Sequence, residues 1–271
     1  MQATFSFGRN WKKFVRDSAD EKALLAAVDS LREFGANPAG RTFIDIGCGS
    51  GLFSLAALRM GAAKVISFDA DQNSVEASLL LRKKFGAEGG NWEISRGSIL
   101  DDALVEKLRG QGDIVYSWGV LHHTGDMHKA VKNAAELVKT GGSLVIAIYN
   151  HGPGAPFWKR VKILYNRLPP LAPFFLCAYL LSFGLYSAIL ELRAKPGAPF
   201  RRRGMKLYYD AVDWLGGYPY EYACFDEIRD FVESLGFRLT LSPTVFPCGK
   251  DSGPSIRLSN TGCNEFVFVR L

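Results

Sequence analysis

The chain has 271 residues, enough to bury one large core, and its 48% hydrophobic and 22% charged residues exclude a disordered protein. The net charge of +6 leaves contact with nucleic acid or an anionic membrane open without requiring it. The five cysteines are odd in number and form no Cys-x-x-Cys pair, which predicts reduced thiols and argues against a disulfide framework or a structural zinc site. No basic stretch followed by an apolar core begins the sequence, so we predict a cytoplasmic protein, with membrane association as an open alternative.

The first helix is predicted over residues 19–34, because apolar residues recur there at helical spacing and Gly35 ends the pattern. Short apolar runs then alternate with helical patterns as far as residue 150. The expected strands are 41–46, 64–69, 92–95, 113–117 and 143–149, and the expected helices are 50–60, 72–85, 101–108 and 126–138, with a turn at Gly141-Gly142. Such alternation predicts parallel strands joined by crossover helices.

The alternation stops after residue 150. Residues 151–222 are rich in proline, aromatic residues and arginine, and we predict that they form a helical insertion. Sheet-like sequence then returns, with a helix expected at 225–235 and strands at 237–241 and 263–270. The predicted fold class is therefore α/β, a doubly wound seven-stranded and mostly parallel sheet with a helical insertion between strands five and six.

Within the insertion, residues 171–190 contain no charged residue and are flanked by basic residues on both sides. A run of roughly 20 apolar residues is long enough to cross a bilayer. Three interpretations are open: a lid or dimer helix pair that is buried, peripheral contact with a membrane surface, and a single span. A span is the least favoured, because it would place the last strands of the sheet on the far side of the membrane.

The most informative motif follows the first strand of the sheet. An apolar run ends at Asp45, and Gly47, Gly49 and Gly51 come next, before a helical pattern. Strand, glycine turn and helix present backbone N–H groups to a ligand at the carboxyl end of the strand. The spacing is neither that of the dinucleotide fingerprint nor that of the phosphate-binding loop. An acid two residues before Gly-x-Gly-x-Gly resembles the first motif of class I S-adenosylmethionine-dependent methyltransferases.

This resemblance implies a Rossmann-like methyltransferase fold and S-adenosylmethionine as the cofactor. Asp69 ends the second strand, where an acid meets the ribose hydroxyls of a bound adenosine, and Asp71 is expected to cap the next helix. Gly97-Ser98 follow the third strand, where the adenine edge rests, and Trp11 is expected either to cover the cofactor or to anchor the core. The predicted cofactor-binding residues are Trp11, Asp45, Gly47, Cys48, Gly49, Gly51, Asp69, Ala70, Gly97, Ser98, Ser117 and Trp118.

The segment after the fourth strand contains Val120-Leu121-His122-His123, which resembles the corresponding motif of small-molecule class I methyltransferases. Imidazole has a near-neutral pKa, so we predict that His123 is a base or orients the acceptor, with Thr124 or Asp126 orienting the ring. His122 is expected to pack or cap beside it. The alternative, that both histidines only shape the cofactor pocket, stays open because methyl transfer by proximity needs no base. The predicted catalytic residues are His123, His122 and Asp126, and no metal site is expected.

Polar groups for a substrate are expected beyond the fifth strand. Tyr149 and Asn150 end that strand, and Arg202 and Tyr208 lie in a basic and aromatic stretch that fits either a phosphate group or a solvated basic face. The predicted substrate-binding residues are Tyr149, Asn150, Arg202 and Tyr208. Short blocks such as Asp213-Trp214-x-Gly216-Gly217-Tyr218-Pro219 resemble a bacterial subgroup of the superfamily, to which we attach no substrate.

The predicted function is transfer of a methyl group from S-adenosylmethionine to a small or lipid-like acceptor, at oxygen. The alternatives are a methyl- or carboxymethyl-transferase that modifies RNA, transfer RNA in particular, and a membrane-associated binding protein that retains the fold. The expected partner is the small-molecule or lipid-like acceptor; nucleic acid is not favoured, and a homodimer or peripheral membrane contact through residues 171–190 stays open.

The predicted division of the chain has four parts. Residues 1–40 form an N-terminal helical lid, 41–150 the cofactor-binding Rossmann-like half, 151–222 a substrate cap or membrane contact, and 223–271 the last helix and the last two strands.

Overall fold

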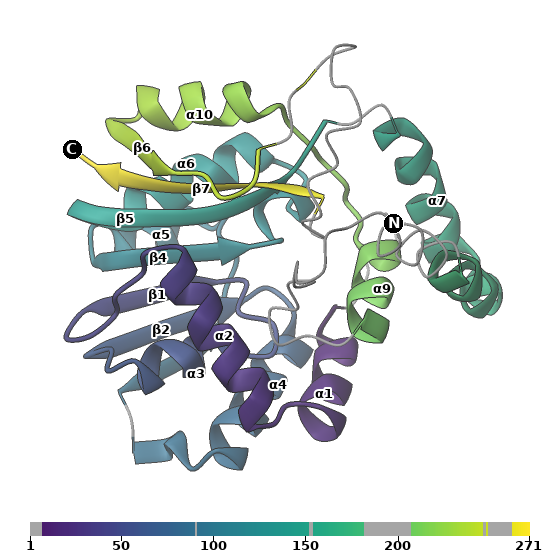
Figure 1. The fold of residues 1–271 in the computed structure, drawn as a ribbon, viewed down its shortest axis with the longest axis horizontal. Helices are drawn as coiled ribbons and strands as arrows, with labels where there is room; N and C mark the ends of the chain where they lie inside the picture. The colour runs from purple at the N-terminus through teal and green to yellow at the C-terminus, as the bar shows by residue number, and fades with distance from the viewer. Residues whose placement is uncertain (1–6, 90, 152–153, 182–206, 246–247, 249–261) are drawn as a thin grey trace, which may run out of the picture.

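The computed structural model describes residues 7–89, 91–151, 154–181, 207–245, 248 and 262–271. A seven-stranded sheet with the order β3-β2-β1-β4-β5-β7-β6 forms the centre of the molecule (Figure 1). Its strands are β1 (Thr42–Ile46), β2 (Lys64–Asp69), β3 (Trp92–Arg96), β4 (Gly112–Trp118), β5 (Val138–Tyr149), β6 (Phe237–Leu241) and β7 (Cys263–Arg270). β1 to β5 pair in parallel, and β7 lies antiparallel between β5 and β6. The predicted doubly wound fold is confirmed.

The direction of strand order reverses at β1, which has β2 on one side and β4 on the other. Asp45 of β1 is in register with Ser67 of β2 and with Tyr116 of β4. Ligands of open α/β sheets bind outside the carboxyl ends of the strands at such a reversal. The glycine loop after β1 therefore begins at the position where this fold binds its ligands.

Helices cover both faces of the sheet. One face carries α2 (Glu21–Glu33), α3 (Leu52–Arg59) and α4 (Gln72–Lys84), and the other carries α5 (Asp102–Leu108), α6 (Met127–Leu137) and α10 (Phe225–Ser234). Neighbouring residues of β1 belong to opposite cores, because Phe43 packs on the first face and Ile44 on the second. A parallel strand that is buried on both faces needs a continuous apolar run, which is what the sequence of β1 provides.

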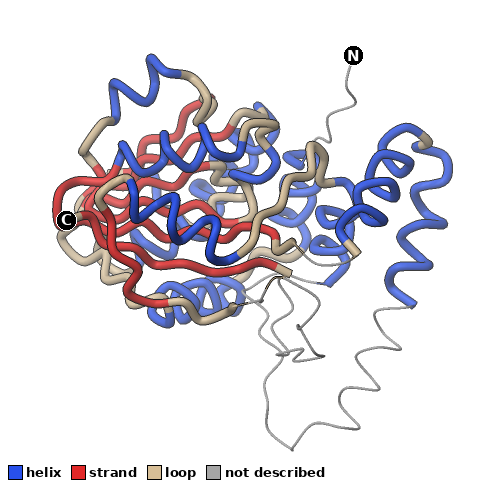
Figure 2. Tube along the Cα trace, turned by 90° about the horizontal axis from the view of Figure 1, so that it is seen from above, coloured by secondary structure: helices blue, strands red, loops and turns tan. Residues whose placement is uncertain are grey.

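Three further helices lie beyond the carboxyl ends of the parallel strands (Figures 1 and 2). They are α1 (Phe7–Asp17), α7 (Ala155–Arg167) and α9 (Leu207–Gly216), and short 3₁₀ helices occur at η1 (Ala87–Gly89), η2 (Leu121–His123) and η3 (Pro169–Leu171). α1 packs against α4 and α9, and α9 packs against α7. The N-terminal segment and the insertion thus meet at the edge of the sheet where the glycine loop lies.

Two elements differ from the prediction. The helix expected over 19–34 is confirmed as α2, but a further helix, α1, precedes it in the aromatic and basic segment, where no separate helix was predicted. β5 begins at Val138, which pairs with Gly112 of β4, so the glycines expected to form a turn before the strand lie inside it. Gly141 has a φ of 76°, a left-handed conformation that glycine adopts without strain. The glycine pair therefore bends the strand rather than starting it.

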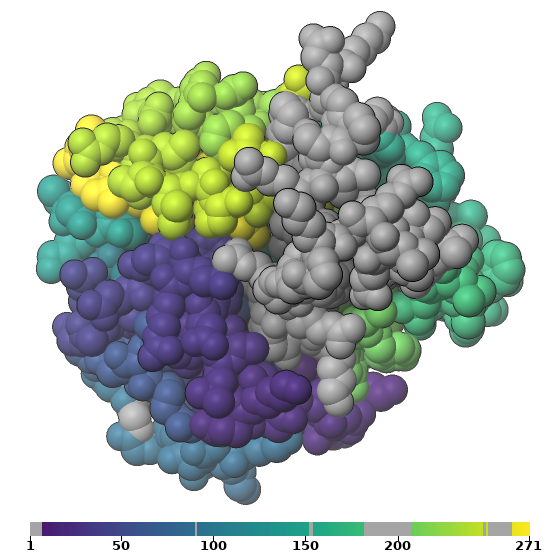
Figure 3. Space-filling view, in the orientation of Figure 1, coloured from purple at the N-terminus to yellow at the C-terminus, as the bar shows by residue number. Residues whose placement is uncertain are grey.

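The uncharged run 171–190 lies within the described residues only as far as residue 181. Residues 172–181 are helical and, with α7, form a helical arm that stands out beside the sheet in the space-filling view (teal to green, Figure 3). Apolar side chains on this arm face outward, with Phe174 and Leu181 exposed at 70% and 74%. Within the described part of the chain, no helix combines the length and the apolar character needed to cross a bilayer.

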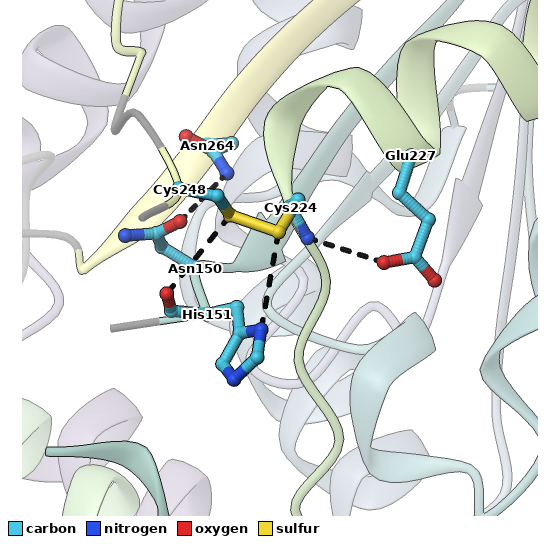
Figure 4. The surroundings of a disulfide bond; sticks show 6 residues. All are labelled: Asn150, His151, Cys224, Glu227, Cys248 and Asn264. Atoms are coloured by element: carbon cyan, nitrogen blue, oxygen red, sulfur yellow. Dashed lines mark hydrogen bonds between the residues drawn. A yellow bond between two sulfur atoms is a disulfide. The ribbon is translucent and has the colours of Figure 1, made fainter. Parts of the chain in front are cut away.

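The prediction of reduced thiols is wrong for two of the cysteines. Cys224, the N-cap of α10, forms a disulfide with Cys248, and the Cα atoms of the two residues are 5.6 Å apart (Figure 4). Cys48, Cys177 and Cys263 are free. The pairing did not follow from the sequence, because no short spacing marks it and Cys224 and Cys248 come together only in the folded chain.

We expect loss of this disulfide to destabilise the fold. Closing a loop with a sequence separation of 24 residues removes chain entropy from the unfolded state worth about 3 kcal/mol. Cys248→Ser should therefore lower the free energy of unfolding by about 3 kcal/mol in urea titrations without reductant. Cys177→Ser, at an exposed free cysteine, is the control and should change it by less than about 0.5 kcal/mol. Equal stability of Cys248→Ser and the parent chain would show that the disulfide contributes nothing.

Candidate active site

The glycine loop joins β1 to α3 through three residues with left-handed backbones. Gly47, Gly49 and Gly51 have φ values of 68°, 54° and 78°, which side chains with a Cβ rarely adopt. The loop is also closely covered, because a Cβ on Gly47 would lie 2.4 Å from the side chain of Val120 and one on Gly49 would lie 3.0 Å from Trp11 Nε1. Glycine is therefore required here both by the turn and by the close approach of neighbouring groups.

Asp69 connects the end of β2 to this loop. Its Oδ2 accepts from the Gly49 N–H at 3.0 Å, and its Oδ1 accepts from the Asp71 N–H at 2.8 Å. Burial raises the pKa of this carboxyl to about 6. Each carboxylate oxygen retains a second lone pair, so the group can still accept bonds from vicinal hydroxyls. Asp71 caps α4 as predicted, accepting from the Asn73 N–H at 2.9 Å.

Several of the predicted cofactor residues have side chains that bond within the protein scaffold. Asp45 is buried and accepts from Ser54 Oγ, Ser117 Oγ donates to the Ile46 carbonyl at 3.2 Å, and Cys48 Sγ lies 3.4 Å from Ser78 Oγ. These side chains fix the loop and the ends of the strands.

The remaining predicted cofactor residues border the loop. Gly97 N–H donates to the Asp69 carbonyl at 3.0 Å, Ser98 Oγ accepts from the Leu100 N–H at 3.2 Å, and Ala70 is exposed. Trp118 is half-buried and packs edge-on against Phe34, with ring centroids 5.1 Å apart.

Hydrogen bonds hold helix α1 against the glycine loop, one to the segment after β2 and two to α9. The Gly8 N–H donates to Asp71 Oδ2 at 3.0 Å. Asn10 Nδ2 donates to Asp213 Oδ1 at 2.9 Å and to the Tyr209 carbonyl at 3.0 Å, both on α9. These bonds hold Trp11 against Gly49, so the N-terminal helix and α9 act as one cover.

The two histidines of η2 have different surroundings. His123 Nδ1 lies 2.6 Å from the Pro219 carbonyl, which can only accept, so the proton is on Nδ1 and Nε2 carries a lone pair. The Tyr149 N–H lies 3.3 Å from His122 Nδ1, and the His122 ring also makes a hydrogen bond with the Ala147 backbone. Burial, followed by the charge on Lys162, lowers the pKa of His123 to about 3, and burial lowers that of His122 well below its usual range.

The structure corrects the predicted partners of His123. Asp126 is the N-cap of α6 and accepts from the Lys129 N–H at 3.1 Å, and Thr124 Oγ1 donates to the Leu121 carbonyl at 2.8 Å. Neither orients His123, because both side chains satisfy backbone groups of the turn that leads into α6. The Pro219 carbonyl, nearly 100 residues further along the chain, performs that task.

The predicted substrate residues are only partly brought together. Tyr149 is buried against His122, with ring centroids 3.9 Å apart, and Asn150 Oδ1 accepts from Asn264 Nδ2 at 3.3 Å. Tyr208 is 44% exposed on α9 with the Lys13 ammonium over its ring, so it lies on the surface. Arg202 lies outside the described residues.

Sequence reasoning missed a buried lysine in this site. Lys162 of α7 is fully buried, its Nζ donates to the Trp214 carbonyl, and it lies 4.1 Å from the centroid of the Trp214 ring and 4.8 Å from that of Tyr220. Burial lowers the pKa of Lys162 to about 7. Lys162 follows Ala155, which is also buried, by seven residues, and this helical spacing puts both on the inner face of α7. That spacing is the sequence signal that could have identified it.

A group of potential metal ligands lies just beyond the end of β5. The donor atoms of His151, Cys224 and Cys248 lie within 4.8 Å of one another, and His151 Nδ1 is 3.8 Å from Cys224 Sγ (Figure 4). No Cys-x-x-Cys or His-x-x-x-His spacing marks this group, because its members come from three separate segments. The two sulfur atoms are joined in the disulfide and are not available as thiolates.

The comparisons with known proteins agree with this geometry. Residues 18–174 match the family described as "Methyltransferase domain", which covers more than half of the chain. The chain therefore belongs to the methyltransferase-domain family, and its fold and glycine loop are those of a class I S-adenosylmethionine-dependent methyltransferase.

Particular relatives differ in what their names say they act on. The ubiquinone biosynthesis O-methyltransferase of Bordetella avium is 31% identical over 142 residues, which are 51% of this chain and 56% of that protein. The ribosomal protein L11 methyltransferase of Shewanella sediminis is 35% identical over 109 residues, 40% of this chain and 34% of that protein. The chain spans about half the length of the ubiquinone O-methyltransferases it matches.

The fold extends beyond the part that matches in sequence. The crystal structure of magnesium protoporphyrin IX methyltransferase from Synechocystis PCC 6803 with bound SAH superimposes with a TM-score of 0.53 and 16% identity. The alignment covers 97% of this chain and 94% of that one, and the likeness concerns the fold.

We expect Asp69→Ala to weaken binding of S-adenosylhomocysteine by about 1–3 kcal/mol, because two acceptors for ribose hydroxyls are lost. Isothermal titration calorimetry at pH 7.5, where Asp69 is ionised, measures the change. Asp29→Ala removes an exposed carboxylate of α2 that pairs with Arg32, and it should leave the affinity unchanged. Undiminished affinity of Asp69→Ala would rule out the ribose contact.

Proposed function

We propose that the protein transfers a methyl group from S-adenosylmethionine to an oxygen atom of a small acceptor, lipid-like acceptors included. The observation that carries the choice of oxygen is the fixed tautomer of His123. Its Nδ1–H is held by the Pro219 carbonyl, so the lone pair of Nε2 is the group that His123 offers to an acceptor hydroxyl.

The residues of the site fit the cofactor. The glycine loop leaves its backbone open to close approach, Asp69 has spare lone pairs for the ribose, and Trp11 provides an aromatic face beside the loop. When bound, the cofactor supplies a methyl group on a cationic sulfonium. We propose that residues 1–40 cover it and that the insertion 151–222 supplies walls of the acceptor pocket.

The low pKa of His123 indicates that the ring acts as a hydrogen-bond acceptor and not as a strong base. With a pKa of about 3, the imidazole is neutral throughout the physiological range and is a weak base. It accepts a hydrogen bond from the acceptor hydroxyl and so points an oxygen lone pair at the methyl carbon. Positioning of this kind, with water excluded by α1 and α9, is the main contribution that the protein makes to methyl transfer.

The exposed apolar arm supports a lipid-like acceptor. Leu171, Phe174 and Leu181 present apolar surface at the same edge of the sheet as the site. An acceptor with an apolar tail would bury part of this surface, at about 25 cal/mol per Å². This surface also supports two further proposals, peripheral membrane contact through residues 171–190 and a homodimer. We propose a cytoplasmic location.

Turnover of a panel of phenolic, catecholic and isoprenoid quinol acceptors, read as formation of S-adenosylhomocysteine, tests the proposal. Bulk transfer RNA belongs in the same panel. Methylation of RNA alone would replace the small-molecule assignment, and no S-adenosylmethionine binding at all would end it.

For an acceptor found in this way, His123→Gln should lower kcat roughly tenfold, because one orienting hydrogen bond is lost, and should leave cofactor affinity unchanged. His128→Gln, on the exposed side of α6, is the matched control and should retain full activity. Loss of cofactor binding in His123→Gln would mean that the ring shapes the cofactor pocket instead.

The pH profile gives a second measurement of the same residue. The folded-state pKa of His123 is depressed to about 3, so the neutral ring persists as the pH falls from 8 to 5. We therefore expect His123 to contribute no ionisation near 6.5, the ordinary pKa of histidine, so the parent chain and His123→Gln should have kcat profiles of the same shape between pH 5 and 8. A step near pH 6.5 that disappears in His123→Gln would contradict this assignment.

A further inference from the structure

Two buried ring nitrogens make no hydrogen bond to the residues that the structure describes. They are Trp214 Nε1, which can only donate, and His122 Nε2, which donates in the tautomer that has its proton there. An unsatisfied buried donor costs about 1–3 kcal/mol, so native proteins provide a partner for it, either water or a ligand.

The buried Lys162 ammonium lies among the same rings. It forms no ion pair within the described part of the chain, and its one hydrogen-bond acceptor there is the Trp214 carbonyl. An ammonium group has three N–H donors, so two remain for another partner. The charges of Cys263 and Asp213 raise the pKa of Lys162, and Asp213 accepts a hydrogen bond from Asn10.

The rings of His122 and Trp214 and the Lys162 ammonium all lie close to the ring of Tyr149. That ring lies 3.9 Å from the His122 ring and 5.0 Å from the Trp214 ring, centroid to centroid, and its centroid is 5.5 Å from Lys162 Nζ. Tyr220 adds a further aromatic wall, 5.3 Å from Tyr149. The cluster thus combines hydrogen-bond donors and a positive charge with flat apolar surfaces.

We infer that Lys162, Trp214 and His122 form a binding site for an ionised oxygen on an aromatic acceptor, a carboxylate or a phenolate. The inference rests on the proposed function in one respect, since it takes the space beside His123 as the place of the acceptor. Donors without a matching acceptor select an anion, and the aromatic walls select a planar ring over an aliphatic chain. Lys162 is in this view a residue that determines specificity.

Benzoate is the probe, and benzamide, which has nearly the same shape without the charge, is its neutral counterpart. Calorimetric titrations of the full chain, saturated with S-adenosylhomocysteine, should show tighter binding of benzoate than of benzamide. Lys162→Met should weaken benzoate binding by about 10- to 100-fold and abolish the preference, because a charge-assisted hydrogen bond is lost. Lys159→Met, on the exposed side of the same helix, should bind benzoate like the parent chain.

Trp214→Phe keeps the ring and removes only the N–H donor, so it should weaken benzoate binding by about 3- to 10-fold while retaining the fold. It keeps the inference testable if Lys162→Met does not fold. Equal affinity of the parent chain for benzoate and benzamide, or unchanged benzoate affinity in both variants, would overturn the inference and would mean that water satisfies these donors.

The pH dependence adds a readout that a merely structural role of Lys162 would not produce. The groups that face Lys162 from neighbouring elements are His122, His123, Tyr149, Asp213, Tyr220 and Cys263. Benzoate stays ionised from pH 6 to 9, and both histidines stay neutral there, so its affinity should fall as the pH rises through about 7 and the ammonium loses its proton. Lys162→Arg should bind without this pH dependence, and a pH-independent parent chain would count against the site.

The same titrations separate this inference from the proposed function. A parent chain that binds S-adenosylhomocysteine but shows no preference for benzoate keeps the proposed function and loses the anion site. A chain that prefers benzoate without any affinity for S-adenosylhomocysteine keeps the anion site and loses the proposed function.

Discussion

The parallel pairing of β1 with β2 on one side and with β4 on the other determines where every functional group lies. Because parallel strands end at the same edge of a sheet, the glycine loop, Asp69 and η2 all emerge within one short row. Hydrogen bonds between these segments then fix the details, such as the bond from the Gly49 N–H to Asp69. Without that register the glycine loop, Asp69 and η2 would not lie next to one another.

The cover over this edge comes from distant parts of the chain. Asn10 in α1 and Asp213 in α9 are about 200 residues apart in sequence, and their hydrogen bond is largely shielded from water. Burial raises the pKa of Asp213, and the Asn10 amide is the principal group that offsets this. This amide–carboxyl contact, together with the bond from Asn10 to the Tyr209 carbonyl, joins the N-terminal helix to the insertion.

The region proposed for the acceptor is built on a different principle from the region proposed for the cofactor. The latter presents backbone groups and one carboxylate, whereas the former gathers aromatic rings around the buried ammonium of Lys162. Burying a lysine in such surroundings is costly, and contact with the faces of aromatic rings offsets only part of the loss of solvation. Groups of this kind are found where a charge serves binding or chemistry more often than where it serves stability alone.

The sequence by itself determined the order of most strands and helices along the chain, the class of the fold, the glycine loop and the acid that ends β2. Each of these follows from local spacing, namely apolar runs, glycines at fixed intervals and an acid at the end of a strand. It also showed that His122 and His123 follow β4. The tertiary structure alone decided which carbonyl holds His123, which cysteines pair and that Lys162 is inside. Those three outcomes depend on contacts between segments far apart along the chain, and no pattern within a single segment records which distant surface it will meet.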